Sequence, residues 1–291
     1  LADCDAIIRA SRNTNGVAYM GMNLRHAPVY QKIHELAAGG RLGRLLTIES
    51  NEYYFEGRSY FRRWNRLGDR SGGLWITKAC HDFDLLNWIS GGKPRRVYAT
   101  SRLSFYKHKP EGGTHCRACP IRKSCPDFYD IARPSNRLWD DLGRLTEEAT
   151  GQPRDVCLYN SVKDTFDNGI ALVEYDNGVR ASYTLSVVAA RTTRQMRIQG
   201  TAGSLEADLD DGRVTTWERY SNKKTVLDLT KTARGVHGGA DIEILADFFR
   251  CCTTGRAPLS NWVDGRRSVQ VGLAARESCK TGKPVTLAGN N

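Results

Sequence analysis

The sequence lacks any long apolar run. A membrane-spanning helix needs about 18 or more apolar residues in succession, and no such stretch occurs among the 291 residues. The first residues, LADCDAIIRA, also lack the basic region followed by an apolar core of a secretory signal peptide. With 40% hydrophobic and 26% charged residues, the composition is that of a soluble globular protein. We therefore expect a cytoplasmic protein without a membrane partner.

A glycine-rich phosphate-binding turn is also missing. No G-x-G-x-x-G occurs anywhere in the sequence. Such a turn lies between a strand and a helix N-terminus, whose free N–H groups bind the pyrophosphate of a dinucleotide. We therefore expect these residues by themselves to bind NAD or NADP poorly.

The positive charge is scattered rather than concentrated. Lys and Arg exceed Asp and Glu by 43 to 32, giving a net charge of +11. This charge suits an anionic partner, which could be nucleic acid, a nucleotide cofactor or a phosphorylated metabolite. Because there is no long basic tail, repeat or low-complexity segment, we expect no nucleic acid among the partners.

Nine cysteines are present, and this odd number argues against a complete disulfide framework. A Cys-x-x-Cys pair in a tight turn can bind one tetrahedral metal ion, and two further thiols complete a four-cysteine site. Structural zinc is the first choice and an iron–sulfur cluster the second. The alternatives are four unpaired thiols, or His115 in place of one ligand. The candidate metal ligands are Cys116, Cys119, Cys125 and Cys157.

The pattern of elements predicts an α/β (α+β) fold. The first residues follow the rhythm of an α/β unit, with helices at 1–16 and 27–43 and strands at 17–26 and 44–56. A helix at 72–92 and a strand at 95–107 follow. Later segments predict antiparallel strands, including a hairpin over 168–188 that turns at Asp176, Asn177 and Gly178. Two amphipathic helices, 239–255 and 264–282, complete a large open mixed or antiparallel sheet backed by helices.

Residues 72–92, GGLWITKACHDFDLLNWISGG, place titratable side chains in an apolar segment. In a continuous helix, Lys78 would share a face with His81 and Asp82. Oxidation of an alcohol by hydride transfer needs a base for the hydroxyl proton, and histidine has a suitable pKa. A partly buried lysine beside another cation would have its pKa lowered toward neutrality. The alternative is a structural helix with a Lys78–Asp82 ion pair and a core histidine.

Three further places carry candidate ligand contacts. Asn23 and Arg25 lie at the end of the expected strand 17–26, where open α/β sheets bind ligands. In SYFRRWNR, an arginine could hold hydroxyls or a carboxylate and Trp64 could stack on a sugar. His237 lies beside two glycines that allow close approach of a ligand. The alternatives are a surface charge for Arg25, an amphipathic basic loop for SYFRRWNR and a loop histidine without a partner for His237. The candidate substrate contacts are Arg63, Trp64, Asn65, Asp82 and His237.

Several segments, in this order, resemble the Gfo/Idh/MocA oxidoreductase family. They are GMNLRHAPVYQKIHELAAGGRLGRLLTIES, the segment from YFRRWNR to NWISGG, NGIALVEYDNGVRASYTLS, IQGTAGSLEAD, HGGADIEILADFF and GKPVTL. The resemblance implies that residues 1–44 are the remnant of an NAD(P)-binding Rossmann domain and that 45–291 form the substrate and oligomerisation domain. A Cys-rich insertion would occupy about 107–160, and the family's Glu-Lys-Pro motif would precede Leu1.

The resemblance implies NAD(P)-dependent hydride transfer to or from a ring hydroxyl of a sugar, sugar derivative or cyclitol. His81 would be the acid/base, with Lys78 contacting the substrate hydroxyl; the family's common Asp four residues before the His is replaced by Thr77. Asn23 and Arg25 are the candidate cofactor contacts because of their place at the strand end, and Arg25 could instead meet the substrate. A homo-oligomer through the open sheet face is also implied. The alternatives are an NAD-dependent glycosidase, a non-catalytic carbohydrate-binding or assembly module, and a zinc-containing nucleic-acid binder.

Overall fold

The computed structural model describes residues 1–131 and 137–287. The longer helices are α1 (Ala2–Ser11), α2 (Pro28–Ala38), α6 (Cys80–Ser90), α7 (Arg137–Thr150), α8 (Ala240–Thr254) and α9 (Trp262–Thr281). The shorter ones are α3 (Arg58–Arg62), α4 (Gly68–Ser71), α5 (Leu74–Thr77) and the 3₁₀ turns η1 (Asn23–His26), η2 (Phe55–Gly57), η3 (Trp64–Arg66), η4 (Cys116–Ala118) and η5 (Val236–Gly239).

The described strands form one nine-stranded sheet in the order β8-β7-β6-β5-β1-β4-β3-β2-β9. Their bounds are β1 (Leu45–Tyr53), β2 (Pro94–Arg102), β3 (Asn168–Tyr175), β4 (Arg180–Ser186), β5 (Gln195–Gly200), β6 (Gly203–Asp208), β7 (Arg213–Glu218), β8 (Lys224–Asp228) and β9 (Val285–Thr286). Only β1 and β4 pair in parallel, and the remaining neighbours are antiparallel. The mixed open sheet is therefore confirmed, as is the β3–β4 hairpin.

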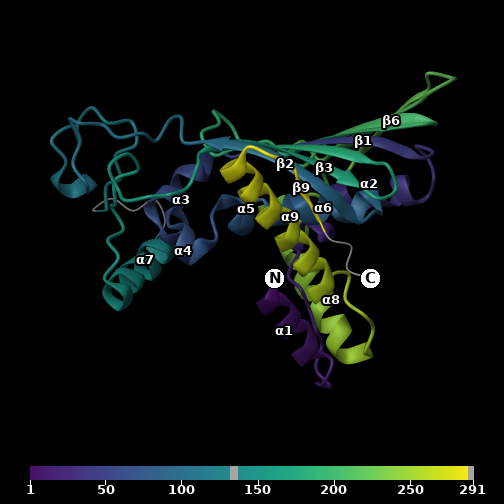
Figure 1. The fold of residues 1–291 in the computed structure, drawn as a ribbon, viewed down its shortest axis with the longest axis horizontal. Coiled ribbons are helices and arrows are strands. Elements are labelled where there is room, and N and C mark those ends of the chain that lie inside the picture. The colour runs from purple at the N-terminus through teal and green to yellow at the C-terminus, as the bar shows by residue number, and fades with distance from the viewer. Residues whose placement is uncertain (132–136, 288–291) are drawn as a thin grey trace.

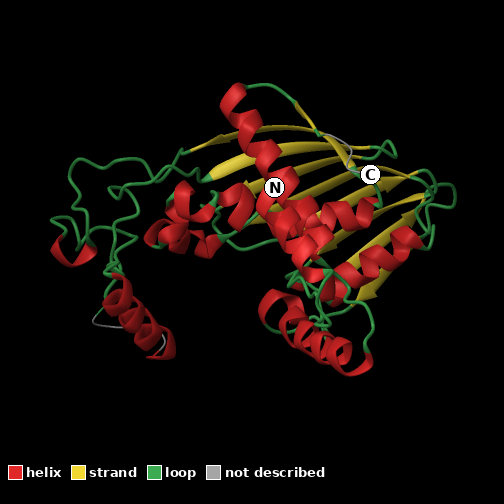
Figure 2. Cartoon of the chain, turned by 60° about the horizontal axis from the view of Figure 1, so that its bottom comes forward, coloured by secondary structure: helices red, strands yellow, loops and turns green. Residues whose placement is uncertain are grey.

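Helices cover one face of this sheet (Figures 1 and 2). Alternate strand residues such as Ile48, Val97 and Tyr183 point into the core and are fully buried, as expected for strands with one covered face. Each fully buried large apolar side chain contributes roughly 1.5–3 kcal/mol. In the described chain no helix is long and apolar enough to cross a membrane.

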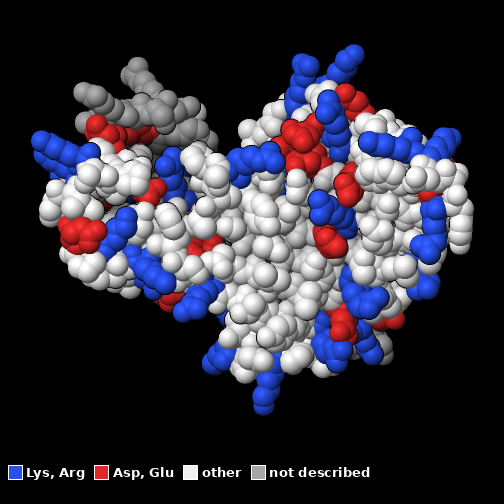
Figure 3. Space-filling view, turned by 90° about the horizontal axis from the view of Figure 1, so that it is seen from above, with Lys and Arg blue, Asp and Glu red and all other residues white. Residues whose placement is uncertain are grey.

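The opposite face of the sheet is open. The strand residues that alternate with the core residues point to this face and are about half exposed, among them Tyr98, Ile170 and Leu172. Seen from this side, the middle of the molecule carries mostly uncharged side chains (Figure 3). Such a patch is typical of a surface that binds another protein.

The expected strand at 17–26 is wrong. Residues 17–22 have no regular structure, and 23–26 form η1. A strand persists only where its backbone groups pair with a neighbour. Among the described residues this segment makes one backbone–backbone hydrogen bond to a distant part of the chain, in which Met20 N donates to Ser260 O. The expectation that residues 1–44 derive from a Rossmann domain remains a prediction.

The region at about 107–160, expected to be an irregular insertion, leaves the sheet and forms a separate lobe at the left of Figure 1. Its one longer helix in the described residues, α7, was not predicted. Two ion pairs hold this helix to the following loop. Arg154 Nη1 lies 2.5 Å from Asp140 Oδ1, and Arg154 Nε lies 3.0 Å from Glu147 Oε2.

A buried ion pair joins η1 to α6. The guanidinium of Arg25 donates from Nε and Nη2 to both carboxylate oxygens of Asp84, each over 2.7 Å. The two side chains are 4% and 1% exposed. Because a charge in an apolar interior is costly without its counter-charge, this pair fixes the position of η1 on the helix layer.

Asp84→Asn should therefore lower the free energy of unfolding by about 3 kcal/mol, since Arg25 would stay buried without its main counter-charge. Urea unfolding of the two proteins measures the difference. The control is Glu35→Gln, which breaks the exposed Lys32–Glu35 pair and should cost less than about 1 kcal/mol. Equal effects of the two substitutions would contradict a structural role for the Arg25–Asp84 pair.

Candidate active site

The titratable segment is two helices rather than one. α5 ends at Thr77, and the N–H groups of Lys78 and Ala79 both donate to Leu74 O. Lys78 has a non-helical φ of −121° and ψ of −56°, and α6 begins at Cys80. The expected single helix face with Lys78, His81 and Asp82 is therefore wrong. The break lets Trp75 of α5 turn into the same apolar core as α6, where its ring lies 6.0 Å from Phe83.

Lys78 and Asp82 instead belong to a chain of buried charged side chains that also includes Glu52 and Arg194. Lys78 Nζ lies 2.6 Å from Glu52 Oε1, at the end of β1. Arg194, just before β5, lies 2.6 Å from the same Glu52 oxygen and 3.0 Å from Asp82 Oδ1. Tyr183 of β4 donates to Asp82 Oδ2 over 2.9 Å. Two cations and two carboxylates thus alternate between α6 and the sheet.

The opposite charges in this cluster keep Glu52 and Lys78 ionised. Burial by itself raises the pKa of Glu52, but Arg194 and Lys78 outweigh it, so the net pKa is lowered. Burial by itself lowers the pKa of Lys78, but Glu52 outweighs it, so the net pKa is raised. The predicted lowering of the Lys78 pKa is therefore wrong, because its nearest charge is a carboxylate rather than a cation. Lys78 is an ammonium held by Glu52.

His81 lies at the start of α6, next to this cluster. Burial, and then the positive charges of Arg194 and Lys78, lower its pKa to about 4. Its Nδ1 atom is buried, and the described part of the chain offers it no hydrogen-bond partner. At neutral pH the ring is therefore an uncharged imidazole, the form that can accept a proton.

Asp82 is not a surface residue, which corrects its expected role as a substrate contact. Its side chain is 0% exposed and is occupied by Arg194 and Tyr183. Burial raises the pKa of Asp82 to about 7. The residue holds Arg194 beneath α6 rather than meeting a ligand.

Two other predicted contacts lie together on the η1 and η5 turns. Asn23 Nδ2 donates to Asp241 Oδ1 over 3.1 Å, and His237 Nδ1 lies 2.9 Å from the same oxygen. His237 is 44% exposed and has a positive φ of 53°. Arg25, by contrast, is buried against Asp84, so a cofactor contact from its guanidinium has no support in this arrangement. The ligand roles of Asn23 and His237 remain predictions.

The predicted substrate contacts Arg63, Trp64 and Asn65 lie directly after α3, at the start of the η3 turn. Trp64 is 50% exposed and Arg63 is exposed, whereas Asn65 is buried. In the preceding helix α3, the ring centre of Tyr60 lies 5.7 Å from Lys78 Nζ. The substrate contacts of Arg63, Trp64 and Asn65 remain a prediction.

Glu52 and Arg194 were missed in the sequence. Glu52 had a usable signal, because it follows Ile48 and Ser50 at every second position and so points to the covered face of β1. An inward carboxylate needs a buried counter-charge. Arg194 has no comparable signal, since it lies in an irregular segment before β5.

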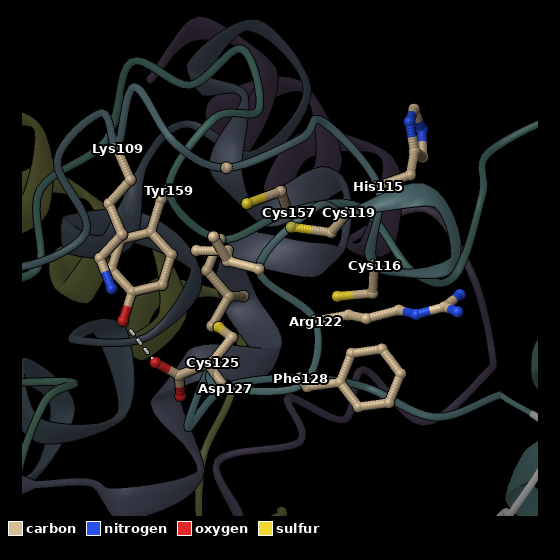
Figure 4. A pocket seen from close by; sticks show the side chains of 13 residues that line it. Lys109, His115, Cys116, Cys119, Arg122, Cys125, Asp127, Phe128, Cys157 and Tyr159 are labelled. Atoms are coloured by element: carbon tan, nitrogen blue, oxygen red, sulfur yellow. Dashed lines mark hydrogen bonds between the residues drawn. The ribbon is translucent and has the colours of Figure 1, made fainter.

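The four predicted metal ligands line one small cavity of about 20 Å³ in the lobe formed by the insertion (Figure 4). Three of the sulfurs accept N–H groups, namely Cys119 from Gly113 N at 3.3 Å, Cys157 from Asn160 N at 3.4 Å and Cys116 from Arg62 Nη1 at 3.5 Å. Yet within residues 1–131 and 137–287 no three side chains of metal-binding type are grouped so that they could hold an ion. An assembled zinc or iron–sulfur site is not supported, and metal binding stays a prediction from the sequence.

Metal analysis of the purified protein tests this prediction. One zinc or one iron cluster per chain is expected, lost in Cys119→Ser because a four-thiolate site loses a ligand. Cys252→Ser, which removes an exposed thiol far from the cavity residues in sequence, is the control. If the unaltered protein carries no stoichiometric zinc or iron, the four cysteines are ordinary thiols.

The chain matches the model of the Gfo/Idh/MocA oxidoreductase family, C-terminal alpha/beta domain, over residues 34–287. It belongs to this family. The match covers the sheet, α6 and the buried charge cluster, so Lys78, His81 and their charged neighbours lie within the matched domain, whereas Asn23 and Arg25 precede it.

Individual relatives agree with this assignment. YteT of Bacillus subtilis, named as an oxidoreductase, is 28% identical over 98% of this chain and 72% of its own length. Inositol 2-dehydrogenase of Rhizobium meliloti is 23% identical over 75% of the chain and 56% of its length. Levoglucosan dehydrogenase, solved with NADH and levoglucosan, has a TM-score of 0.72 at 15% identity and covers 98% of the chain. The chain spans 70% of that structure.

The pKa of His81 should respond to its charged neighbours. We expect His81 to titrate near pH 4 by NMR and its pKa to rise in Lys78→Met, because a nearby positive charge is removed. The control, Lys283→Met, removes an exposed lysine and should leave the titration unchanged. A His81 pKa near the ordinary 6.5 in the unaltered protein would disprove the buried, cation-flanked environment.

Proposed function

We propose that this domain serves an NAD(P)-dependent oxidoreductase that moves a hydride to or from a ring hydroxyl of a sugar, sugar derivative or cyclitol. The observation that carries the proposal is the position of buried His81 at the start of α6, next to the Lys78–Glu52–Arg194 charges that help to lower its pKa, within a domain of an oxidoreductase family. Relatives named as inositol and levoglucosan dehydrogenases support the substrate class.

In this proposal His81 accepts the hydroxyl proton. Its ring is uncharged at neutral pH, so it can act as a base during alcohol oxidation and return the proton in the reverse direction. Lys78 stays charged and donates a hydrogen bond to the substrate oxygen, which stabilises developing negative charge there. Glu52 and Arg194 position Lys78 but contact no ligand themselves.

The nicotinamide cofactor would supply the hydride acceptor or donor. Solved relatives hold NADH or NAD, which supports NAD(P) for this family. The described residues contain no glycine-rich phosphate turn, and we assign only Asn23 of the η1 turn as a cofactor contact. The exposed apolar face of the sheet supports a homo-oligomer as the assembly state (Figure 3).

His81→Ala should lower kcat about 100-fold or more, because general-base catalysis contributes roughly 10²–10⁴. Turnover is measured with NAD⁺ and a panel of sugars and cyclitols, using the longest reading frame that contains this sequence. His108→Ala, which removes an exposed histidine of the insertion, should leave kcat unchanged. Full activity of His81→Ala would exclude His81 as the base, and carbohydrate binding without any turnover would favour the non-catalytic binding module.

A further inference from the structure

A cleft of about 860 Å³ lies between the α3–α4 segment and α7, away from His81. Its volume is in the range of small-molecule sites, about 300–1,000 Å³. Of the described residues lining it, one carries a carboxylate, Asp140, and six are arginines: Arg58, Arg62, Arg63, Arg66, Arg70 and Arg154. We call this feature the arginine cleft.

Two of the six arginines have carboxylate neighbours. Arg154 binds Asp140 and Glu147 at 2.5 and 3.0 Å, so its charge is neutralised. Arg58 lies 3.9 Å from Asp127, a distance at which the attraction is weak near a surface.

The other four arginines have no carboxylate partner in the described chain. Arg62 donates to the backbone oxygens of Asp127 and Val156, at 2.6 and 3.1 Å. Arg66 donates to the backbone oxygens of Val162 and Arg63, at 3.1 and 2.9 Å. Carbonyl oxygens satisfy the N–H groups but leave the charges in place.

Arg63 and Arg70 are exposed, and the described residues provide no hydrogen bond or ion pair to either guanidinium. Burial, and then the nearby charge of Arg70, lower the pKa of Arg66. Four uncompensated cations on one side of a cleft repel one another and favour the binding of an anion there.

The remaining lining suits a carbohydrate. Trp64 lies in the cleft with half of its side chain exposed, and an exposed indole can pack on the apolar face of a sugar ring. Ser59, Thr146, Thr150 and Gln152 supply donors and acceptors for hydroxyl groups. The volume of about 860 Å³ matches a small ligand.

We propose that the arginine cleft binds an acidic saccharide, with its carboxylate or phosphate held by Arg63 and Arg70 and a sugar ring packed on Trp64. Arginine forms paired hydrogen bonds with either anion. Only the choice of a carbohydrate rests on the function proposed above. Neither Lys78 nor His81 lines the cleft, so we treat it as a binding site separate from the proposed reacting centre.

Titration calorimetry on the chain, without cofactor, tests this binding directly. Cellobiouronic acid is compared with cellobiose, and glucose 6-phosphate with glucose, so that each pair differs only in its anionic group. One or both anionic ligands should bind at least about tenfold more tightly than the neutral sugar, as charged hydrogen bonds imply. Affinity should fall as salt is raised. The pair that shows the larger difference identifies carboxylate or phosphate as the anion.

Arg63→Gln and Arg70→Gln should each weaken binding of the anionic ligand about tenfold or more, without changing the thermal midpoint, because both side chains are exposed. Arg276→Gln, an exposed arginine of α9 outside the cleft, is the matched control. Arg63→Lys should recover part of the affinity, since it keeps the charge but loses the paired geometry.

The proposal is overturned if acidic and neutral sugars bind equally, or if Arg63→Gln and Arg70→Gln behave like Arg276→Gln. It is also overturned if a single-stranded RNA oligomer binds and none of the saccharides does. Because no turnover is measured, an inactive but ligand-binding protein would count against the proposed oxidoreductase and not against the cleft.

Discussion

The buried chain Lys78–Glu52–Arg194–Asp82 is the interaction on which the rest of the site depends. It joins the start of α6 to the ends of β1 and β5. Lys78 pairs with Glu52, and Arg194 pairs with both Glu52 and Asp82. Removal of any one of these side chains therefore leaves an uncompensated charge in a low-dielectric interior. The cluster thereby fixes the position of His81 and supplies the positive charges that, together with burial, keep its imidazole neutral.

Arginines play two different roles in this molecule, and their partners distinguish them. Arg25 and Arg194 are buried against carboxylates and hold parts of the fold together. Arg62 and Arg66 bind backbone oxygens and keep their charge. Much of the net charge of +11 is scattered, but the arginine cleft gathers charge that no described acidic side chain neutralises.

Local sequence patterns predicted most of the sheet. The turn at Asp176, Asn177 and Gly178 and the alternation on both sides of it identified the β3–β4 hairpin, because these signals act between residues close in sequence. The strand expected at 17–26 failed because apolar residues alone do not supply a pairing partner. The helix expected at 72–92 was broken at Lys78, since two short helices bury Trp75 and Phe83 in one core.

The sequence by itself determined the family, the helix-backed mixed sheet and the choice of Lys78 and His81 as candidate site residues, because these follow from ordered motifs and local periodicity. Only the tertiary structure decided that Lys78 pairs with Glu52, that Asp82 is buried against Arg194, and that Arg63 and Trp64 line a cleft together with residues of α7. These contacts join residues far apart in the chain. These side chains come close together only after the sheet and helices have packed, so no local sequence pattern could specify their pairing.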